Sequence, residues 1–154
     1  MTEAASRAKI RVLFVCTGNS ARSVMAEALL RHRGGGDFEV FSAGTDPRGI
    51  NPLTVLTLQE AGLPTNDLSS KSVEQFLGAK FDYVITVCDQ ARQSCPVFPG
   101  SHQSLHWGYE DPAEAIGTDD ERARVFRAVF TQLSQRIGQF LVIARRARDQ
   151  GAAA

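Results

Sequence analysis

The chain has 154 residues, of which 17 are basic and 17 acidic, so its formal net charge is zero and gives no overall field that would attract nucleic acid or an anionic membrane. The length predicts a single domain, residues 1–154 with an ordered core of about 9–147, that can fold without a disulfide or a metal. The longest early apolar run, residues 12–15, is too short for a signal peptide or a membrane span, so we expect a cytoplasmic protein.

Strand-like and helix-like patterns alternate along the first half of the chain. The β-branched and aromatic runs predict strands, and the helices are marked by apolar periodicity and by glycine or proline at their ends. The expected elements are a strand at 9–15, a helix from about Ser23 to the glycines at 34–36, a strand at 38–43, a helix at 51–61 and a shorter helix at 72–77.

The second half continues this alternation. A buried strand is predicted at 82–87 and a further strand at 103–107, with a long loop between them. Apolar residues recur at helical spacing in a last helix at about 119–146, and this stripe is expected to face the core. The arginines at 145, 146 and 148 are interpreted as a solvated helix end. The alternation predicts an α/β fold with three layers, a parallel sheet flanked by helices on both faces, and ligands at the carboxyl ends of the strands.

The loop after the first strand carries the clearest chemical signal. Cys16 ends the strand, and Arg22 stands where the next helix begins. Small residues between them let backbone N–H groups point inward at an anion, and the helix dipole adds to this field. The predicted oxyanion-binding residues are Thr17, Gly18, Asn19, Ser20, Ala21 and Arg22.

Three side chains of this loop are expected to have separate tasks. Arg22 presents two parallel donors to two oxygens of the anion, and Asn19 holds a left-handed turn. The Ser23 hydroxyl donates a hydrogen bond to the Cys16 sulfur. The positive surroundings are expected to lower the Cys16 pKa and make the thiolate the resting nucleophile. The alternative is a buried strand-end cysteine beside a surface arginine, because a cysteine followed six positions later by an arginine also arises by chance.

An acid is expected after the last strand. Asp111 precedes Pro112 in a loop that could fold back over Cys16, where its carboxyl group would protonate a leaving oxygen. The alternative for an Asp-Pro pair is a simple turn or helix start. His102, His106 and Trp107 are interpreted as loop and packing residues without catalytic roles.

These motifs resemble the low-molecular-weight protein tyrosine phosphatase superfamily. The resemblance rests on residues 16–23, on Ser42-Ala43-Gly44-Thr45 and on Asp111-Pro112, and it spans about residues 9–145. Cys88 and Cys95, followed by His106-Trp107-Gly108, are similar to the thioredoxin-coupled arsenate reductases of that superfamily. The resemblance implies a four-stranded parallel sheet, Cys16 as nucleophile, Asp111 as acid and Cys88 and Cys95 as relay cysteines.

Two departures from the family pattern bear on function. The phosphatases usually carry tyrosine directly after Asp-Pro, whereas this chain has Ala113, which favours the reductase. Reductases with a potassium site use residues that Asn19, Glu27 and Ser42 match. The acidic position of that site corresponds to Lys71, whose ammonium could take the place of the ion, and this argues against a potassium requirement.

The predicted function is therefore reduction of arsenate to arsenite through a Cys16, Cys88 and Cys95 disulfide relay, with thioredoxin as reductant and residual phosphatase activity. Arsenate and other tetrahedral oxyanions are the expected ligands of a monomer that needs no cofactor, no metal, no nucleic acid and no membrane. The alternatives are a phosphotyrosine phosphatase whose other cysteines protect Cys16, a reductase coupled to a low-molecular-weight thiol, and a non-catalytic oxyanion-binding module. Cys88 as a core residue, or a zinc site at Cys88 and Cys95, is the alternative for that pair.

Overall fold

A four-stranded parallel sheet forms the centre of the computed structural model, which describes residues 8–153, with side chains up to residue 151. The strands are β1 (Ile10–Cys16), β2 (Phe38–Gly44), β3 (Tyr83–Thr86) and β4 (Gln103–His106), and their order across the sheet is β2-β1-β3-β4. All neighbouring pairs are parallel, which confirms the predicted α/β fold. β1 lies inside the sheet and is almost continuously apolar, as expected for a strand that is covered on both faces.

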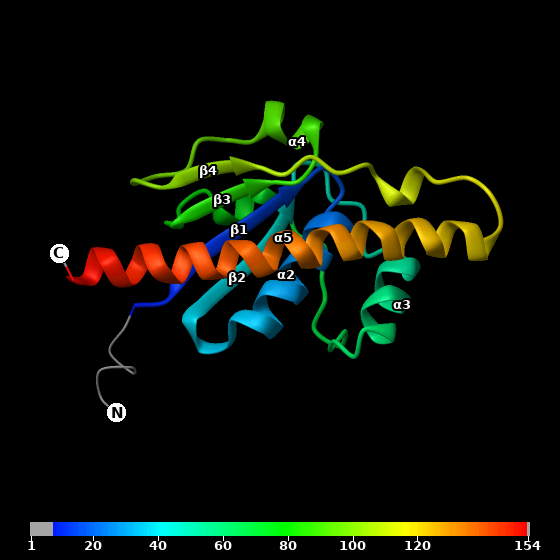
Figure 1. Cartoon of the computed structure of the whole chain (residues 1–154). Helices are drawn as coiled ribbons and strands as arrows, with labels where there is room; N and C mark the ends of the chain where they lie inside the picture. Colours follow the sequence, from blue (N-terminus) through cyan, green and yellow to red (C-terminus); the bar gives the residue numbers. More distant parts are fainter. Residues whose placement is uncertain (1–7, 154) are drawn as a thin grey trace.

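Helices and loops cover the two faces of this sheet (Figure 1). Helix α5 (Asp119–Ala153) crosses one face next to α2 (Arg22–Gly34), and the two helices are in contact. The remaining helical elements are α3 (Pro52–Glu60), α4 (Asp89–Ser94), and the 3-10 turns η1 (Gly35–Asp37), η2 (Val73–Phe76) and η3 (Pro112–Glu114).

Aromatic side chains fill the core on both sides of the sheet. On the α5 side, Phe140 contacts Phe38, Tyr83 and Trp107, with ring centroids 4.9–6.3 Å apart. Side chains alternate between the two faces along a strand. Phe38 and Phe41 of β2 are three positions apart, so Phe41 lies on the opposite face from Phe38. There it packs against Phe76 of η2 and against Phe81. The predicted apolar stripe of the last helix is buried, except for the half-buried Phe130.

Three elements differ from the sequence-based expectation. The long loop predicted between the last two strands contains α4, a single short helix whose first backbone groups are capped by Cys88. The segment predicted as a helix at 72–77 is a 3-10 turn, capped by Ser72. Helix α5 continues to Ala153, beyond the expected end near residue 146 and through residues expected outside the ordered core. Residues 1–7 and 154 lie outside the described part of the chain.

The extension of α5 has a packing reason. Arg145 and Arg148 were predicted to be solvated, but both donate hydrogen bonds of 2.9 Å to the Asp37 carboxylate in η1. Arg145 also donates to the carbonyl of Gly34, the last residue of α2. These contacts tie the last turns of α5 to the end of α2, so the helix gains partners that its own sequence does not reveal.

The strand order places the Cys16 loop at the centre of the carboxyl edge. β2 pairs with one edge of β1, and β3 pairs with the other edge. The connections that leave β1 and β2 therefore run to opposite sides, and a crevice is expected at the carboxyl end of β1, between them. Cys16, Gly44, Thr86 and His106 end the four strands at this edge. Within residues 8–153, no helix combines the length and apolar character that crossing a membrane requires.

Candidate active site

The Cys16 loop curls around the Cys16 sulfur. Asn19 has a φ of 45°, the left-handed conformation expected for it, and its backbone N–H donates to Cys16 Sγ at 3.1 Å. The Ser23 hydroxyl lies 2.8 Å from the same sulfur. Cys16, Asn19 and Ser23 are each at most 2% exposed. The loop is therefore a tight, buried turn centred on a thiol.

The segment between β2 and α3 holds the loop from outside. Backbone N–H groups of Thr45, Asp46, Arg48 and Asn51 donate in turn to the carbonyls of Cys16, Thr17, Gly18 and Ser20, at 2.9–3.1 Å. These carbonyls therefore point away from the loop centre, which leaves the N–H groups to face inward. Ala21 precedes α2 without a side-chain cap, so the first N–H groups of this helix also remain available to an anion.

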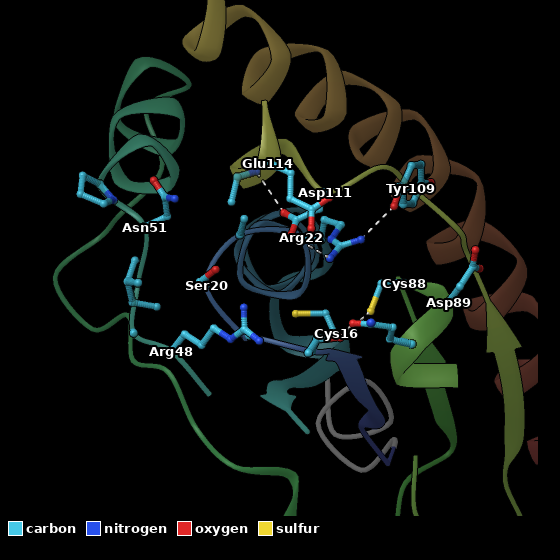
Figure 2. Close-up of a pocket in the computed structure, with 18 residues that line it drawn as sticks. Cys16, Ser20, Arg22, Arg48, Asn51, Cys88, Asp89, Tyr109, Asp111 and Glu114 are labelled. Carbon is cyan, nitrogen blue, oxygen red and sulfur yellow. Dashed lines mark hydrogen bonds and ion pairs between the residues drawn. The ribbon is translucent and has the colours of Figure 1, made fainter. Parts of the chain in front are cut away.

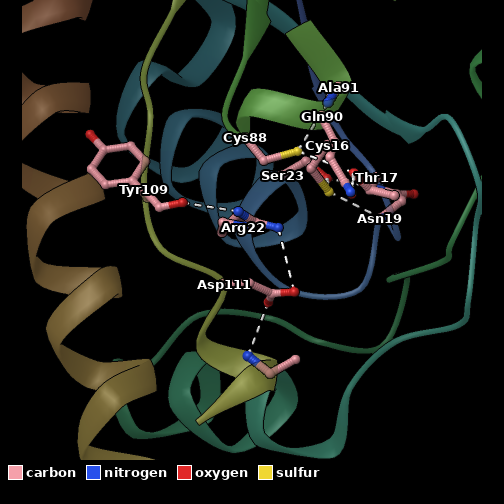
Figure 3. Close-up of polar contacts among 11 residues, drawn as sticks. Cys16, Thr17, Asn19, Arg22, Ser23, Cys88, Gln90, Ala91, Tyr109 and Asp111 are labelled. Atoms are coloured by element: carbon pink, nitrogen blue, oxygen red, sulfur yellow. Dashed lines mark hydrogen bonds and ion pairs between the residues drawn. The ribbon is translucent and has the colours of Figure 1, made fainter. Parts of the chain in front are cut away.

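Arg22 and Asp111 meet above this loop, although 89 positions separate them in the sequence (Figure 3). Arg22 Nη1 donates to the Tyr109 carbonyl at 2.9 Å, and Nη2 lies 3.6 Å from Asp111 Oδ2. The Arg22 side chain is only 10% exposed, while that of Asp111 is 31% exposed. The other Asp111 oxygen accepts the Ala113 N–H at 3.0 Å, which caps η3. The loop after β4 thus folds back over Cys16 and brings a carboxyl group to the oxyanion site.

Cys88 lies next to the Cys16 loop. Its sulfur is 3.3 Å from the Thr17 hydroxyl and accepts the Ala91 N–H of α4 at 3.4 Å. Figure 3 shows Cys16 and Cys88 at the same end of the loop. Cys88 is 4% exposed, and the Thr17 hydroxyl also lies 3.4 Å from Gln90 Oε1.

Cys95 does not line the cleft that Cys16 and Cys88 share. It follows α4 and lines a separate cavity of about 440 Å³ with His102 and His106. It is half-buried, and burial raises the pKa of its thiol. All three thiols are free, and no set of three or more His, Cys, Asp or Glu side chains within the described residues could hold a metal ion.

The pKa of Cys16 is shifted upward, whereas the sequence predicts a downward shift. Burial raises the pKa of this thiol above its ordinary value, and this effect exceeds the lowering by the Ser23 hydroxyl, the Asn19 N–H and the Arg22 charge. Arg22 is the weakest of these influences, and its guanidinium also faces Asp111 and the Tyr109 carbonyl. The loop therefore supplies donors to the sulfur, but burying the charge of a thiolate costs more than these donors return.

The cleft above Cys16 is wider than the loop itself. It has a volume of about 610 Å³, and Figure 2 shows Cys16, Arg22, Cys88 and Asp111 around it. Several other residues that line the cleft were not predicted from the sequence, because they come from distant loops and from the starts of α3, α4 and η3. These are Arg48, Gly49, Ile50, Asn51, Pro52, Asp89, Gln90, Tyr109, Ala113 and Glu114.

His106 also lies closer to the site than expected. It ends β4, and its Nε2 is 2.9 Å from Asp89 Oδ1, while its Nδ1 is 2.8 Å from the Thr86 hydroxyl. The imidazole therefore connects β3 and β4 to the first residue of α4, the helix that Cys88 caps. Trp107 is 5% exposed and packs in the core, as interpreted from the sequence.

The residues that match a potassium site do not fit such an ion here. Both Glu27 oxygens have partners, because Oε1 accepts the Ser42 hydroxyl and Oε2 binds Arg31. Asn19 Oδ1 accepts the Lys71 N–H at 2.7 Å. The Lys71 ammonium, expected in the ion's place, instead donates to the Ser69 carbonyl at 2.9 Å. These oxygens are already engaged by donors of the chain itself.

The fold and the Cys16 loop together define a class of protein. A parallel α/β sheet whose switch point carries a cysteine, an anion-facing loop and a buried arginine is built to hold a tetrahedral oxyanion over a thiol. The chain belongs to the low molecular weight phosphotyrosine protein phosphatase family, whose model matches residues 11–150.

Relatives within this family are named arsenate reductases. One from Halalkalibacterium halodurans is 40% identical over 129 residues, which cover 84% of this chain and 93% of that protein. A solved arsenate reductase from Archaeoglobus fulgidus is 31% identical, with a TM-score of 0.68 over 84% of this chain and 98% of that one. A thioredoxin-dependent arsenate reductase from Corynebacterium glutamicum is 31% identical, with a TM-score of 0.58 over 90% of this chain and 66% of that one.

Proposed function

We propose that this protein reduces arsenate to arsenite, with Cys16 as nucleophile and thioredoxin as the final reductant. The observation that carries the proposal is the placement of a second thiol, Cys88, beside the Cys16 loop. A phosphatase needs only the loop, the arginine and the acid, whereas reduction needs two electrons from a further thiol. The relatives named arsenate reductases support the same substrate.

In the first step, the Cys16 thiolate attacks arsenic while the inward N–H groups and Arg22 hold the oxyanion. A sulfur–arsenic bond forms, and one oxygen departs as water after taking a proton from Asp111. The position of Asp111 beside Arg22 suits this role, because the carboxyl group faces the same oxyanion site. Arsenic remains in the pentavalent state in the resulting adduct.

In the second step, the Cys88 thiolate attacks the Cys16 sulfur. The sulfur–arsenic bond breaks, its electron pair stays on arsenic, and arsenite leaves while a Cys16–Cys88 disulfide forms. Attack by water on arsenic would instead return arsenate unchanged. The position of Cys88 between the Thr17 hydroxyl and the first turn of α4 supports this step, because both can donate hydrogen bonds to a thiolate.

In the third step, Cys95 attacks Cys88, which frees Cys16 and leaves a Cys88–Cys95 disulfide for reduction by the two thiols of thioredoxin. Cys88 and Cys95 flank opposite ends of α4, and Cys95 lines a different cavity, so this six-residue helix has to rearrange before the two sulfurs can join. A reducing compartment such as the cytoplasm suits the relay.

Substitution of the relay cysteines tests this assignment. Cys88→Ser is expected to abolish arsenate reduction, and Cys95→Ser to permit one turnover per molecule but no further cycles. Arsenite would be measured with thioredoxin, thioredoxin reductase and NADPH present. Full multiple-turnover reduction in either variant would refute the relay.

A second candidate is hydrolysis of phosphate esters by Cys16, Arg22 and Asp111. The cleft of about 610 Å³ favours it, because this space extends well beyond a single tetrahedral oxyanion. Hydrolysis of p-nitrophenyl phosphate would measure it. Efficient ester hydrolysis together with no arsenate turnover in the wild-type protein would identify the phosphatase as the function.

A further inference from the structure

Glu27 is a buried carboxylate that the proposed reaction does not touch. It lies on α2, is 6% exposed, and accepts the Ser42 hydroxyl at 2.5 Å through Oε1. Its other oxygen pairs with Arg31 one helical turn later. A carboxylate removed from water is costly unless it is paired and hydrogen-bonded, and Glu27 meets both conditions through Arg31 and Ser42.

A continuous chain of hydrogen bonds joins Glu27 to the Cys16 sulfur. From Ser42 it passes to Asn19 Nδ2 at 3.0 Å, from there to the Ser23 hydroxyl at 2.8 Å, and from Ser23 to Cys16 Sγ at 2.8 Å. Ser42, Asn19 and Ser23 are fully buried. Water therefore does not compete for these donors and acceptors, and each proton in the chain has a defined place.

The two ends of this chain fix the direction of its donors. Asn19 Oδ1 accepts the Lys71 backbone N–H, so the amide NH₂ group must face both serines. At the far end, the Glu27 carboxylate can only accept, so Ser42 donates to it and accepts from Asn19.

This order of donors also determines which hydrogens face the Cys16 sulfur. Because the Ser23 oxygen accepts a hydrogen from Asn19, its single hydrogen is free to point at Cys16. The Asn19 backbone N–H points at the same sulfur. Cys16 Sγ therefore accepts from two donors, and both oppose the effect of burial, which raises the pKa of this thiol.

Arg31 supplies the positive charge for Glu27. Its guanidinium binds the Glu27 carboxylate and also donates to the Val40 carbonyl of β2 at 2.7 Å, while Asp67 lies 3.6 Å away on the solvent side. Arg31 is thus anchored on the sheet as well as on its own helix. Without this charge, Glu27 would place an uncompensated negative charge in the layer that supports the Cys16 loop.

We propose that Arg31 is a built-in counter-ion of Glu27, and that the Arg31–Glu27 pair is a positioning element for Cys16 that takes the place of a bound alkali cation. The proposal deepens the proposed function, since it assumes that Cys16 is the nucleophile. The pair acts through Ser42, Asn19 and Ser23, and neither member touches the substrate.

Other charged and titratable groups also face the two ends of this hydrogen-bond chain. In the comparison below, Cys88 is a serine in every protein, Asp67 changes only in its own control variant, and the remaining groups are unchanged. Around Cys16 these are Arg22, Arg48, Cys88, Asp89, Asp111 and Glu114. Around Glu27 and Arg31 they are His32 and Asp67.

The test is the pH profile of Cys16 alkylation by iodoacetamide. A full-length Cys88→Ser/Cys95→Ser parent leaves Cys16 as its single thiol, because the chain has three cysteines. The profile would be recorded in potassium chloride and in tetramethylammonium chloride at equal ionic strength. We expect the parent to give the same profile in both salts.

Arg31→Ala in this parent is expected to raise the apparent pKa of Cys16 by about half a unit or more, which slows alkylation at neutral pH about threefold. Arg31→Lys should keep the parent profile, and adding Glu27→Gln to Arg31→Ala should remove the shift, because no unbalanced charge is left. Asp67→Asn is the matched control on the exposed side of Arg31, and its profile should equal that of the parent.

An Arg31→Ala profile equal to the parent profile would overturn the proposal. So would a parent profile that differs between the two salts, a comparison that needs no destabilising substitution. Alkylation requires neither arsenate nor the relay thiols, so a failure of the proposed reductase function would be visible separately as absent arsenite production.

Discussion

Asp111 Oδ2 lies 3.6 Å from Arg22 Nη2, over the loop that holds Cys16. This contact joins the loop after β4 to the first residue of α2, and it places the proposed acid and the proposed oxyanion-binding cation in the lining of the same cleft. The remaining Arg22 contact, with the Tyr109 carbonyl, fixes the guanidinium plane from the same loop. The placement of the acid therefore depends on Arg22 as well as on its own turn.

Asp111→Asn should lower kcat for arsenate reduction by roughly 10²-fold or more, with a smaller effect on KM. The asparagine can still cap η3 through its carbonyl oxygen, but it cannot protonate a departing oxygen. Steady-state kinetics would measure the change. Glu110→Gln alters the exposed neighbouring carboxylate and serves as the control, expected to stay near wild type. An unchanged kcat in Asp111→Asn would remove Asp111 from the mechanism.

Arg22→Lys should weaken oxyanion binding by about tenfold or more and lower kcat further, because lysine cannot present two parallel donors. Inhibition by inorganic phosphate would report the binding loss. Arg48→Lys is the comparison at the exposed rim, where the side chain is 68% exposed and pairs with Asp46, and a change under about threefold is expected there. Equal losses in the two variants would contradict the central position given to Arg22.

Gly44→Ala should damage the Cys16 loop from outside. A Cβ atom at Gly44 would lie 2.4 Å from the Thr17 carbonyl oxygen and 2.9 Å from the Asn19 nitrogen, so the loop backbone would have to move. We expect a loss of about 1–3 kcal/mol in the free energy of unfolding, together with lower activity.

Gly78→Ala is the matched control for that variant, because a Cβ atom there would meet no atom within 4 Å. Chemical denaturation would compare the two proteins. Wild-type stability and activity in Gly44→Ala would show that the loop tolerates displacement.

Asp37→Asn should destabilise the contact between η1 and α5. Hydrogen bonds from Arg148 and Arg145 hold the pKa of Asp37 below its ordinary value of 3.8. A lowered pKa in the folded state means that the carboxylate stabilises the fold above about pH 4 and that this contribution is lost as the pH falls through the folded-state pKa.

The side chain of Asp37 is 37% exposed, so solvent screening limits the expected loss to about 0.5–1 kcal/mol at neutral pH. The difference in Tm between wild type and Asp37→Asn should shrink as the pH falls towards 3. Asp46→Asn, in a more exposed pair, is the control for this stability measurement. A difference that grows with acidity would contradict the assignment.

The sequence predicted the parts of the molecule that are encoded locally. The apolar runs of β1 and β3 indicated a buried parallel sheet, and the turn-forming residues after Cys16 indicated an anion-facing loop. Both features depend on neighbours in the chain. The left-handed turn at Asn19 follows from the same local chemistry.

The parts that were missed depend on tertiary contacts. The pairing of Arg31 with Glu27 at i,i+4 was readable in principle, but its burial against β2 was not. The Asp37 contacts with α5 and the Tyr109 carbonyl on Arg22 join segments about 90 or more positions apart. The burial that raises the pKa of Cys16 likewise arises only when the layers pack.

The central claim is a relay of three thiols, and one measurement tests it most directly. Reduced wild-type protein would be mixed with arsenate in the absence of any reductant, quenched by acid and alkylation, and digested for mass spectrometry of its disulfides. The relay predicts one arsenite per protein and a Cys88–Cys95 disulfide, with Cys16 recovered as an alkylated thiol. Arsenite formation with Cys88 and Cys95 both recovered as free thiols would contradict the relay.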